Sequence, residues 1–290
     1  MTVRIDDWQV AFDGLEFPEC PRWHDGQLWF SDMWQHTVCR VTPGDRVEVV
    51  HQFPDDEDPG GLGWLPDGDL LVAGMNHRVV YRISSGQATV RADLSGLAPH
   101  QLNDMIVTAD GTAFVSQFGF DLHSAEPMLA PSVVIRVASD GRVSAAADDL
   151  IVPNGIAVDE GTQTLVVAES GAGRLTRFAL RDGELAERTE EPIHVGDAYP
   201  MTAPDGLCLD AEGARWVADS INNRVLRILD GTIVDEHNLG RNVLACTLGG
   251  HDRRTLFVCV NDVWSKRDRR SEPTGTILWT RVTTPGRGRP

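Results

Sequence analysis

Short apolar runs recur along the chain, each after a turn rich in glycine and acidic residues. Successive centres of these runs lie 42, 43, 52, 50 and 41 positions apart, at Trp29, Leu71, Phe114, Val166, Trp216 and Phe257. A spacing of roughly 40–50 residues is typical of stacked or radial repeats. The pattern therefore predicts six copies of one structural unit.

Each unit reads as four β-strands. The first strand is a short run such as Gly155–Val158, and a tight turn connects it to the apolar run, which is the second strand. The third strand alternates between apolar and polar residues, as in Val79–Ile83. The fourth is more polar, as in Ala88–Leu94. Such runs between Gly-containing turns indicate β-structure, and no segment keeps a helical period of about 3.6 residues. The chain is therefore predicted to be all-β, a six-bladed β-propeller formed by residues 1–290 as a single domain.

The sixth unit ends after its third strand, Thr276–Val282. Its missing outer strand is predicted to come from Arg4–Phe12, which precedes the first unit. An N-terminal strand in this place would close the ring and remove its free edges. An open solenoid would need atypical capping repeats at both ends, and the sequence shows none.

Polar side chains recur at one position of the repeat, where the first strand begins. When the units are aligned on their apolar centres, this position lies 10 to 12 residues earlier and holds Glu19, Asn103, Asn154 and Asp205. The other two units carry Gly60/Gly61 and Ala245/Cys246 there. Because the first strand of each propeller blade lines the central channel, we expect the four polar side chains to converge at one mouth of that channel.

Two carboxylates and two amides, with no His or Cys, form an all-oxygen ligand set. Such a set suits Ca²⁺ better than Zn²⁺, so Ca²⁺ is the expected cofactor, with Zn²⁺, Mn²⁺ and Mg²⁺ as alternatives. Asn or Asp before Gly also forms turns without binding any ligand. The shared register in four units, with a proline before three of them (Pro18, Pro153 and Pro204), favours the metal site.

A second group of polar residues ends the second strand of the same four units, namely Asp32, Gln117, Glu169 and Asp219. The tight turn reverses the chain, so these residues return to the same mouth. We expect them to orient the ligands, as groups behind a metal site commonly do. Simple solvated loop polarity is the alternative.

The charge balance narrows the class of partner. The net charge is −17, and Lys266–Arg270 is the strongest basic patch, which argues against nucleic acid and anionic membranes and suits a bound cation. No apolar run approaches the ~20 residues of a membrane span, and the N-terminus lacks a signal-peptide core. Five widely spaced cysteines fit neither a disulfide framework nor a zinc pattern, so we expect a cytoplasmic protein with reduced thiols.

Four motifs, PECPRW, LNDMIV, VPNGIAV and APDGLCLD, resemble those of the senescence marker protein/gluconolactonase family, which includes regucalcin and bacterial sugar lactonases. The likeness extends from about Gly14 to Val260. The resemblance implies a six-bladed propeller with a divalent cation, usually Ca²⁺, in its channel. It also implies metal ligation by Glu19, Asn154 and Asp205, with Asn103 as a further ligand or substrate contact and Asp205 as general base in lactone hydrolysis.

One position departs from the family pattern. Sugar lactonases of the regucalcin type carry Arg two residues before this Asn, where it holds sugar hydroxyls, and this chain carries Gln101. A guanidinium offers five donors and a charge, whereas a glutamine amide offers two donors and one acceptor. We therefore expect a substrate less polar than an aldonolactone.

Other residues are candidates for substrate contacts. Met105, Phe118, Phe120, Trp34 and Tyr199 are predicted either to line an apolar pocket or to pack between blades.

Two insertions lengthen the repeat. The first, Gly119–Pro131, is expected to form a lid in which His123 acts as an acid or base, with a solvated loop histidine as the alternative. The second, Asn261–Thr274, is expected to be a solvated basic loop.

Together these features predict a metal-dependent hydrolase of a small-molecule lactone or related ester. The cation would polarise the carbonyl, and Asp205 or a metal-bound hydroxide would supply the attack. One alternative is a non-catalytic binding propeller, since Ile221–Ile228 looks like a repeat of NHL-type interaction propellers. Another is a hydrolase that opens an epoxide or a phosphoester. The sequence contains no GxSxG, HExxH, P-loop or GxGxxG motif, so serine-hydrolase, zincin and nucleotide-binding functions lack support.

Overall fold

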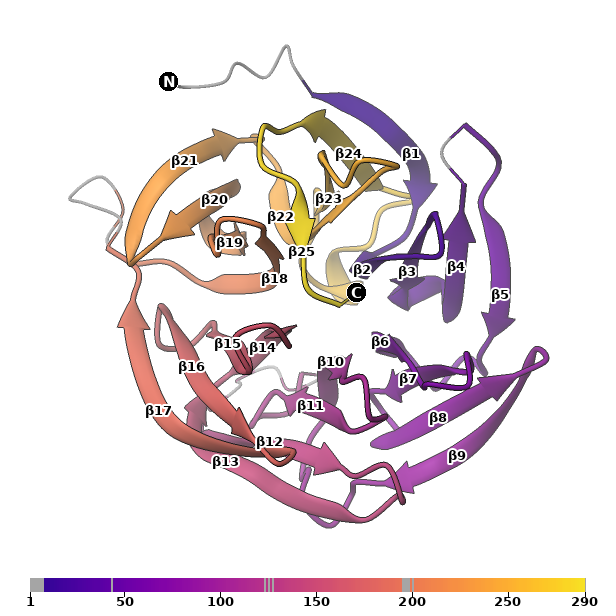
Figure 1. Ribbon diagram of the computed structural model, residues 1–290. Helices are drawn as coiled ribbons and strands as arrows, with labels where there is room; N and C mark the ends of the chain where they lie inside the picture. Colours follow the sequence, from indigo (N-terminus) through magenta and orange to yellow (C-terminus); the bar gives the residue numbers. More distant parts are fainter. Residues whose placement is uncertain are drawn as a thin grey trace.

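Six antiparallel sheets form a ring of blades around a central axis, so the six-bladed propeller prediction is confirmed (Figure 1). The computed structural model describes residues 8–42, 44–122, 124, 126, 128–194, 199 and 201–289. The helical turns described are η2 (Met33–Gln35), η3 (Ser220–Asn222) and η4 (Lys266–Asp268). In this part of the chain no helix has the length and apolar character needed to span a bilayer.

The strands follow the chain from the inside of each blade to its outside. The first blade consists of β2 (Pro18–His24), β3 (Gln27–Asp32), β4 (Thr37–Val41) and β5 (Glu48–Gln52). The second consists of β6 (Pro59–Trp64), β7 (Leu70–Gly74), β8 (Val79–Ser84) and β9 (Gln87–Asp93). The third consists of β10 (Leu102–Val107), β11 (Ala113–Gln117), β12 (Pro131–Val137) and β13 (Val143–Ile151). The fourth blade consists of β14 (Pro153–Asp159), β15 (Thr164–Glu169), β16 (Arg174–Arg181) and β17 (Glu184–Pro192). The fifth contains β18 (Pro204–Asp210), β19 (Arg215–Asp219), β20 (Arg224–Leu229) and β21 (Thr232–Asn238). The sixth contains β22 (Asn242–Gly249), β23 (Thr255–Asn261) and β24 (Gly275–Arg281).

The N-terminal strand closes the ring, as predicted. β1 (Gln9–Leu15) pairs antiparallel with β24 and completes the sixth blade, in the order β1-β24-β23-β22. The first part of the predicted strand, Arg4–Asp7, lies outside the described residues. Joining the two chain ends in one blade gives the outer edge of β24 a hydrogen-bonded partner.

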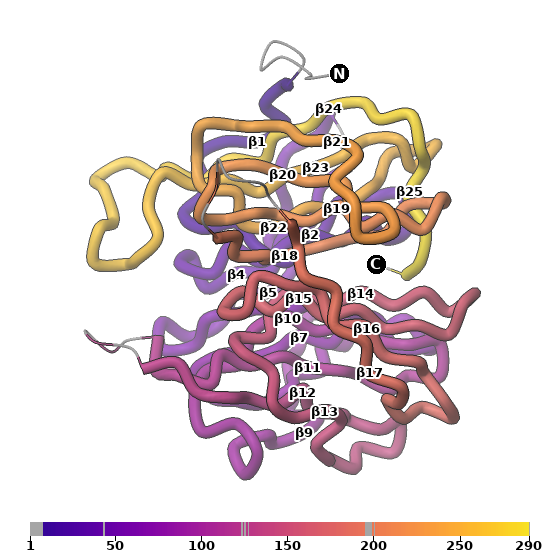
Figure 2. Tube along the Cα trace, turned by 90° about the vertical axis from the view of Figure 1, so that its left-hand side faces the viewer, coloured from indigo at the N-terminus to yellow at the C-terminus, as the bar shows by residue number. Residues whose placement is uncertain are grey.

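The C-terminal end of the chain adds a strand that the repeat pattern does not reveal. β25 (Gly286–Arg287) pairs with the inner strand β18 and lies across the centre of the ring (Figure 1). Seen from the side, the C-terminus lies on the face opposite to the long loop between β23 and β24 (Figure 2). Beside the tail only about 20 Å³ of space remains, with Arg22, Leu209, Arg287 and Arg289 among its walls. The tail therefore covers this mouth of the channel.

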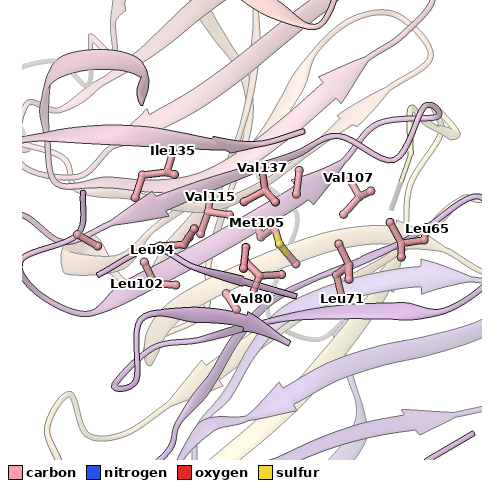
Figure 3. Packing of buried hydrophobic residues seen from close by; sticks show 14 residues of the cluster. Leu65, Leu71, Val80, Leu94, Leu102, Met105, Val107, Val115, Ile135 and Val137 are labelled. Carbon is pink, nitrogen blue, oxygen red and sulfur yellow. The ribbon is translucent and has the colours of Figure 1, made fainter. Parts of the chain in front are cut away.

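The core consists of six apolar clusters, each lying between two neighbouring blades. In β15, Leu165 and Val167 pack toward the third blade, whereas Val166 and Ala168 pack toward the fifth. Both faces of a middle strand are therefore buried, which is why these strands read as continuous apolar runs. Figure 3 shows one cluster, in which Leu71 and Val80 of the second blade meet Val115 of the third.

Removal of residues 1–12 should lower the melting temperature. The deletion strips most of β1 from β24, and a loss of ~2 kcal/mol moves the melting temperature by about 5 °C in a domain of this size. Circular dichroism melts measure the shift. Val10→Ala is the matched control, because this β1 side chain is 58% exposed and its loss leaves the backbone pairing intact. An unchanged melting curve for the deletion would contradict the closure scheme.

Candidate active site

The inner strand of every blade has a break in its pairing register near its start. The breaks lie between Glu19 and Arg22 in β2, Leu102 and Met105 in β10, Pro153 and Ile156 in β14, and Pro204 and Leu207 in β18, with matching breaks in β6 and β22. A β-bulge re-aims the side chains that it contains, and it is common next to functional sites. Asn103, Asn154 and Asp205 lie inside these breaks, and Glu19 is the last paired residue before the break in β2.

In the sixth blade the aligned position was assigned wrongly. The register break there lies between Val243 and Ala245, so Leu244 occupies the bulge instead of Ala245/Cys246. Leu244 also lines the central cavity described below. One blade therefore contributes an apolar side chain to the ring of bulges.

The glycines that follow Asn154 and Asp205 serve close packing rather than turns. A Cβ on Gly155 would lie 2.6 Å from the Asp205 carbonyl oxygen, and one on Gly206 would lie 2.3 Å from Ala245 Cβ. Asn154 and Asp205 themselves lie within β14 and β18. The alternative that these residues only form turns is therefore wrong.

The four polar side chains converge on one cavity. Glu19, Asn103, Asn154 and Asp205 all line a space of about 460 Å³ at the mouth of the channel. Asn103 is 9% exposed and Asp205 8%, so both reach this space from within the packed inner strands. Residues up to 186 positions apart in sequence, Glu19 and Asp205, meet here because their blades surround one axis.

Burial makes the two carboxyl groups hold their protons. Desolvation raises the pKa of Glu19 to about 8, Asp104 raises it further, and the Cys20 backbone N–H and Arg22 oppose the rise. Burial also raises the pKa of Asp205 well above its usual range, with contributions from Glu19 and Asp104, while a hydrogen bond from Asn154 lowers it. A shared cation would stabilise the ionised form of two carboxyl groups that repel each other in a desolvated space.

The residues present fit a hard divalent cation. The Asn103 side-chain nitrogen is buried and has no hydrogen-bond partner among the described residues, so this N–H donor remains available to an acceptor atom of a molecule in the cavity. All four side chains offer oxygen ligands, as Ca²⁺ prefers. No cluster of three or more His, Cys, Asp or Glu side chains suited to a metal occurs in the described ranges, and this set instead combines two carboxylates with two amides.

The residues expected to orient the ligands bind backbone groups, and Glu169 and Asp219 also pair with the side chains of Arg174 and Arg224. Asp32 accepts hydrogen bonds from the N–H groups of Glu16 (3.0 Å) and Phe17 (2.8 Å), just before β2. In the same way Glu169 binds the Ile151 N–H at 2.8 Å, and Asp219 binds the Ala203 N–H at 3.2 Å. Gln117 donates to the Leu97 carbonyl. Asp32, Glu169 and Asp219 thereby fix the chain that leads into their inner strands, and the role of the four residues in orienting the ligands stays a prediction.

A buried ion pair beneath the site was not predicted. Arg22 Nη2 lies 2.5 Å from Asp104 Oδ1, and the two residues are 5% and 3% exposed. Asp104 also accepts from the N–H groups of Met105 (2.8 Å) and Ile156 (3.2 Å). The pair therefore connects β2, β10 and β14. The sequence did contain a signal for this pair. Arg22 and Asp104 lie in inner strands, and charges that are buried in such strands are stable only when they are paired.

The predicted apolar pocket is partly confirmed by position. Phe118 and Trp34 line the cavity, and the half-buried Phe120 packs edge-on against Phe118 at 5.6 Å between ring centroids. Met105 follows the alternative prediction of packing between blades, because it is fully buried in the core cluster between the second and third blades (Figure 3). Tyr199 stacks under the Arg224 guanidinium instead, 3.7 Å from ring centroid to carbon.

Two predicted substrate contacts come from the first insertion and its neighbourhood. Gln101 lines an adjacent hollow with His100 and Asp121, and its side-chain oxygen accepts from the Leu122 N–H at 3.1 Å. Leu122 lines the main cavity and Gln101 is not among its lining residues, so the predicted contact of Gln101 with substrate stays a prediction. His123 lies outside the described residues.

The second insertion was also interpreted wrongly. The loop between β23 and β24 is not merely solvated, because Trp264, Ser265, Lys266 and Arg267 line the cavity. The loop projects from the face opposite to the C-terminal tail (Figure 2). Two of its basic residues, Lys266 and Arg267, therefore line the site.

The raised pKa of Glu19 predicts a pH-dependent stability when divalent cations are chelated. Folded Glu19 keeps a proton that the unfolded chain loses near its ordinary pKa of 4.5, so its contribution to the unfolding free energy should fall as pH rises from about 5 to about 8. Urea titrations of wild type and Glu19→Gln measure the difference between the two pH slopes. Glu212→Gln, an exposed carboxylate with a lowered pKa, should leave the slope unchanged. Equal slopes for wild type and Glu19→Gln would contradict the pKa assignment.

Comparisons with known proteins place these features in a family. The family model described as SMP-30/Gluconolactonase/LRE-like region matches residues 17–261. A 6-deoxy-6-sulfogluconolactonase from Pseudomonas putida is 26% identical over 286 residues, which cover 94% of this chain and 93% of that protein.

Solved structures agree with this match. A gluconolactonase from Xanthomonas campestris has a TM-score of 0.71 and 25% identity, covering 93% of this chain and 88% of its own. A calcium-binding protein, regucalcin, from Agrobacterium tumefaciens has a TM-score of 0.78 and 19% identity, covering 97% and 95%. With a six-bladed ring and a family match over most of its length, the chain belongs to the SMP-30/gluconolactonase family.

Proposed function

We propose that this protein is a divalent-cation-dependent hydrolase of lactones. The observation that carries the proposal is the convergence of Glu19, Asn103, Asn154 and Asp205 on one cavity. The lactonase and gluconolactonase relatives support the reaction class. The calcium-binding neighbour and the all-oxygen donor set support Ca²⁺ as the cation.

The four side chains would hold the cation, with Glu19 and Asp205 neutralising its charge. When bound, the cation supplies Lewis-acid stabilisation for the negative charge that develops on the lactone carbonyl oxygen. Both carboxylates must be ionised for this, so loading the site releases the protons that burial otherwise retains.

Asp205 serves as general base. Its carboxylate accepts a proton from the water that attacks the lactone carbonyl, and it returns that proton to the ring oxygen when the acyl–oxygen bond breaks. One water is consumed and one hydroxy acid is formed. The surrounding Phe17, Trp34 and Phe118 limit the access of other water and hold the apolar part of the ring.

A non-catalytic binding propeller has no need for a general base. Asp205→Asn should therefore lower kcat by about 100-fold or more and weaken Ca²⁺ binding, because it removes a charge but keeps the shape. Lactone hydrolysis and calorimetric Ca²⁺ titration measure the two effects. Asp230→Asn is the control, since it makes the same change at an exposed position of the same blade. Equal kinetics and affinity in the two variants would overturn the proposal.

The wall of the cavity supports a substrate with an apolar body. Its apolar lining residues are Phe17, Met33, Trp34, Met75, Phe118, Leu122, Leu244 and Trp264. We expect alkyl-substituted γ- and δ-lactones to be hydrolysed faster than gluconolactone. Phe118→Ala should lower kcat/KM for the alkyl lactones by about tenfold, as expected for a lost apolar contact, and change gluconolactone turnover little. Initial rates corrected for spontaneous hydrolysis test this, and a clear wild-type preference for gluconolactone would contradict it.

A further inference from the structure

Lys266 is the single lysine in a chain whose other 25 basic residues are all arginine. It lies in η4 of the loop between β23 and β24, and it lines the same cavity as Glu19 and Asp205. Its place in that cavity is not explained by the metal ligands or by the general base. A cationic side chain facing a substrate cavity can bind an anionic part of a ligand.

The Lys266 ammonium is held in position by a carboxylate that precedes the second blade. Its Nζ lies 2.8 and 2.9 Å from the two oxygens of Asp58, which is 4% exposed. His36 Nδ1 lies 3.0 Å from one of the same oxygens, so Asp58 is itself fixed. An ammonium has three N–H donors, and two contacts with one carboxylate leave at least one donor for another partner.

The loop does not depend on Lys266 alone for its attachment. Arg269 donates to both oxygens of Glu16, at 2.9 and 2.6 Å, and the Ser265 side chain accepts from the Arg267 backbone N–H. A second anchor therefore holds the segment to the first blade. The Lys266–Asp58 contact is therefore not the loop's sole attachment.

The charges around the cavity suit an anionic ligand once the site holds its cation. Three lining residues are acidic (Glu19, Asp58 and Asp205), and two are basic (Lys266 and Arg267). With these groups ionised the lining has one net negative charge, and a divalent cation changes it to one net positive charge. The whole protein has a net charge of −17, so a cavity with one net positive charge would attract a ligand with a single anionic group.

We propose that Lys266 forms an anion subsite that selects lactones carrying a negatively charged substituent. Carboxylate, sulfonate and phosphate groups share the acceptor chemistry that an ammonium binds. The apolar wall holds the body of the ring, and Lys266 binds the charged end. This substrate class rests on the proposed lactonase function, whereas the subsite itself is a statement about ligand binding.

Kinetics with a matched pair of substrates test the selection. A γ-lactone with a ring carboxylate and its carboxamide differ only in charge. Lys266→Gln should lower kcat/KM for the carboxylate by about tenfold or more and leave the carboxamide within about twofold, while Lys266→Arg should keep most of the preference. Sulfonate and phosphate analogues then rank the anions. Arg270→Gln, the same loss of charge on the same loop, should have no selective effect, because Arg270 pairs with Asp262 outside the cavity lining.

A labelling experiment tests the subsite without using activity. Because Lys266 is the only lysine, acetylation followed by mass spectrometry reports on this side chain and on the terminal amine as an internal control. With Ca²⁺ present, the hydroxy diacid formed from the carboxylated lactone should slow Lys266 acetylation by about fivefold, and its monoamide should protect less. Equal protection by both, or loss of both substrates' turnover in Lys266→Gln, would overturn the subsite. Absence of lactone turnover in wild type with protection retained would overturn only the proposed function.

Discussion

The close approach of six inner strands around one axis is the constraint on which the rest of the structure depends. These strands come so near to one another that a Cβ on Gly61 would lie 2.0 Å from the Met105 nitrogen, and Gly155 and Gly206 are restricted in the same way. Close packing at the axis forces the pairing register to break near the start of each inner strand. At or beside these breaks, five blades each bring one side chain to the cavity (Glu19, Asn103, Asn154, Asp205 and Leu244), and the second blade has Gly60 and Gly61 there.

Charge burial is the second condition that the site must satisfy. Burial raises the pKa of both Glu19 and Asp205, Asp104 raises both further, Glu19 adds to the rise at Asp205, and Arg22 opposes the rise at Glu19. Such an arrangement is unfavourable in the protein by itself. A bound cation would make it favourable, because the positive charge offsets the repulsion between the buried carboxylates. The same repulsion would therefore contribute to the proposed affinity for Ca²⁺.

The ring and the loops have different parts in the proposed chemistry. The bulges of the inner strands place the four oxygen donors, and the acids at the ends of the second strands, such as Asp32 and Glu169, fix the backbone behind them. The substrate side of the cavity is instead formed by segments outside the repeat, including Leu122 and the Trp264–Arg267 stretch. The proposed metal ligands therefore lie on regular strands, whereas the walls that would contact the substrate lie mainly on loops.

The sequence by itself determined the repeat, the all-β class, the closing role of the N-terminal strand and the four polar residues of the site. Each of these follows from local patterning, because strand alternation and turn residues act over a few positions, and a fixed repeat length makes equivalent positions equivalent in space. Only the tertiary structure decided that Leu244 fills the sixth position, that Met105 belongs to the core, that Asp104 pairs with Arg22, and that Lys266 reaches Asp58 from 208 residues away. These outcomes depend on which side of a bulge a side chain faces and on how loops fold over the ring, and neither is encoded in the spacing of the repeat.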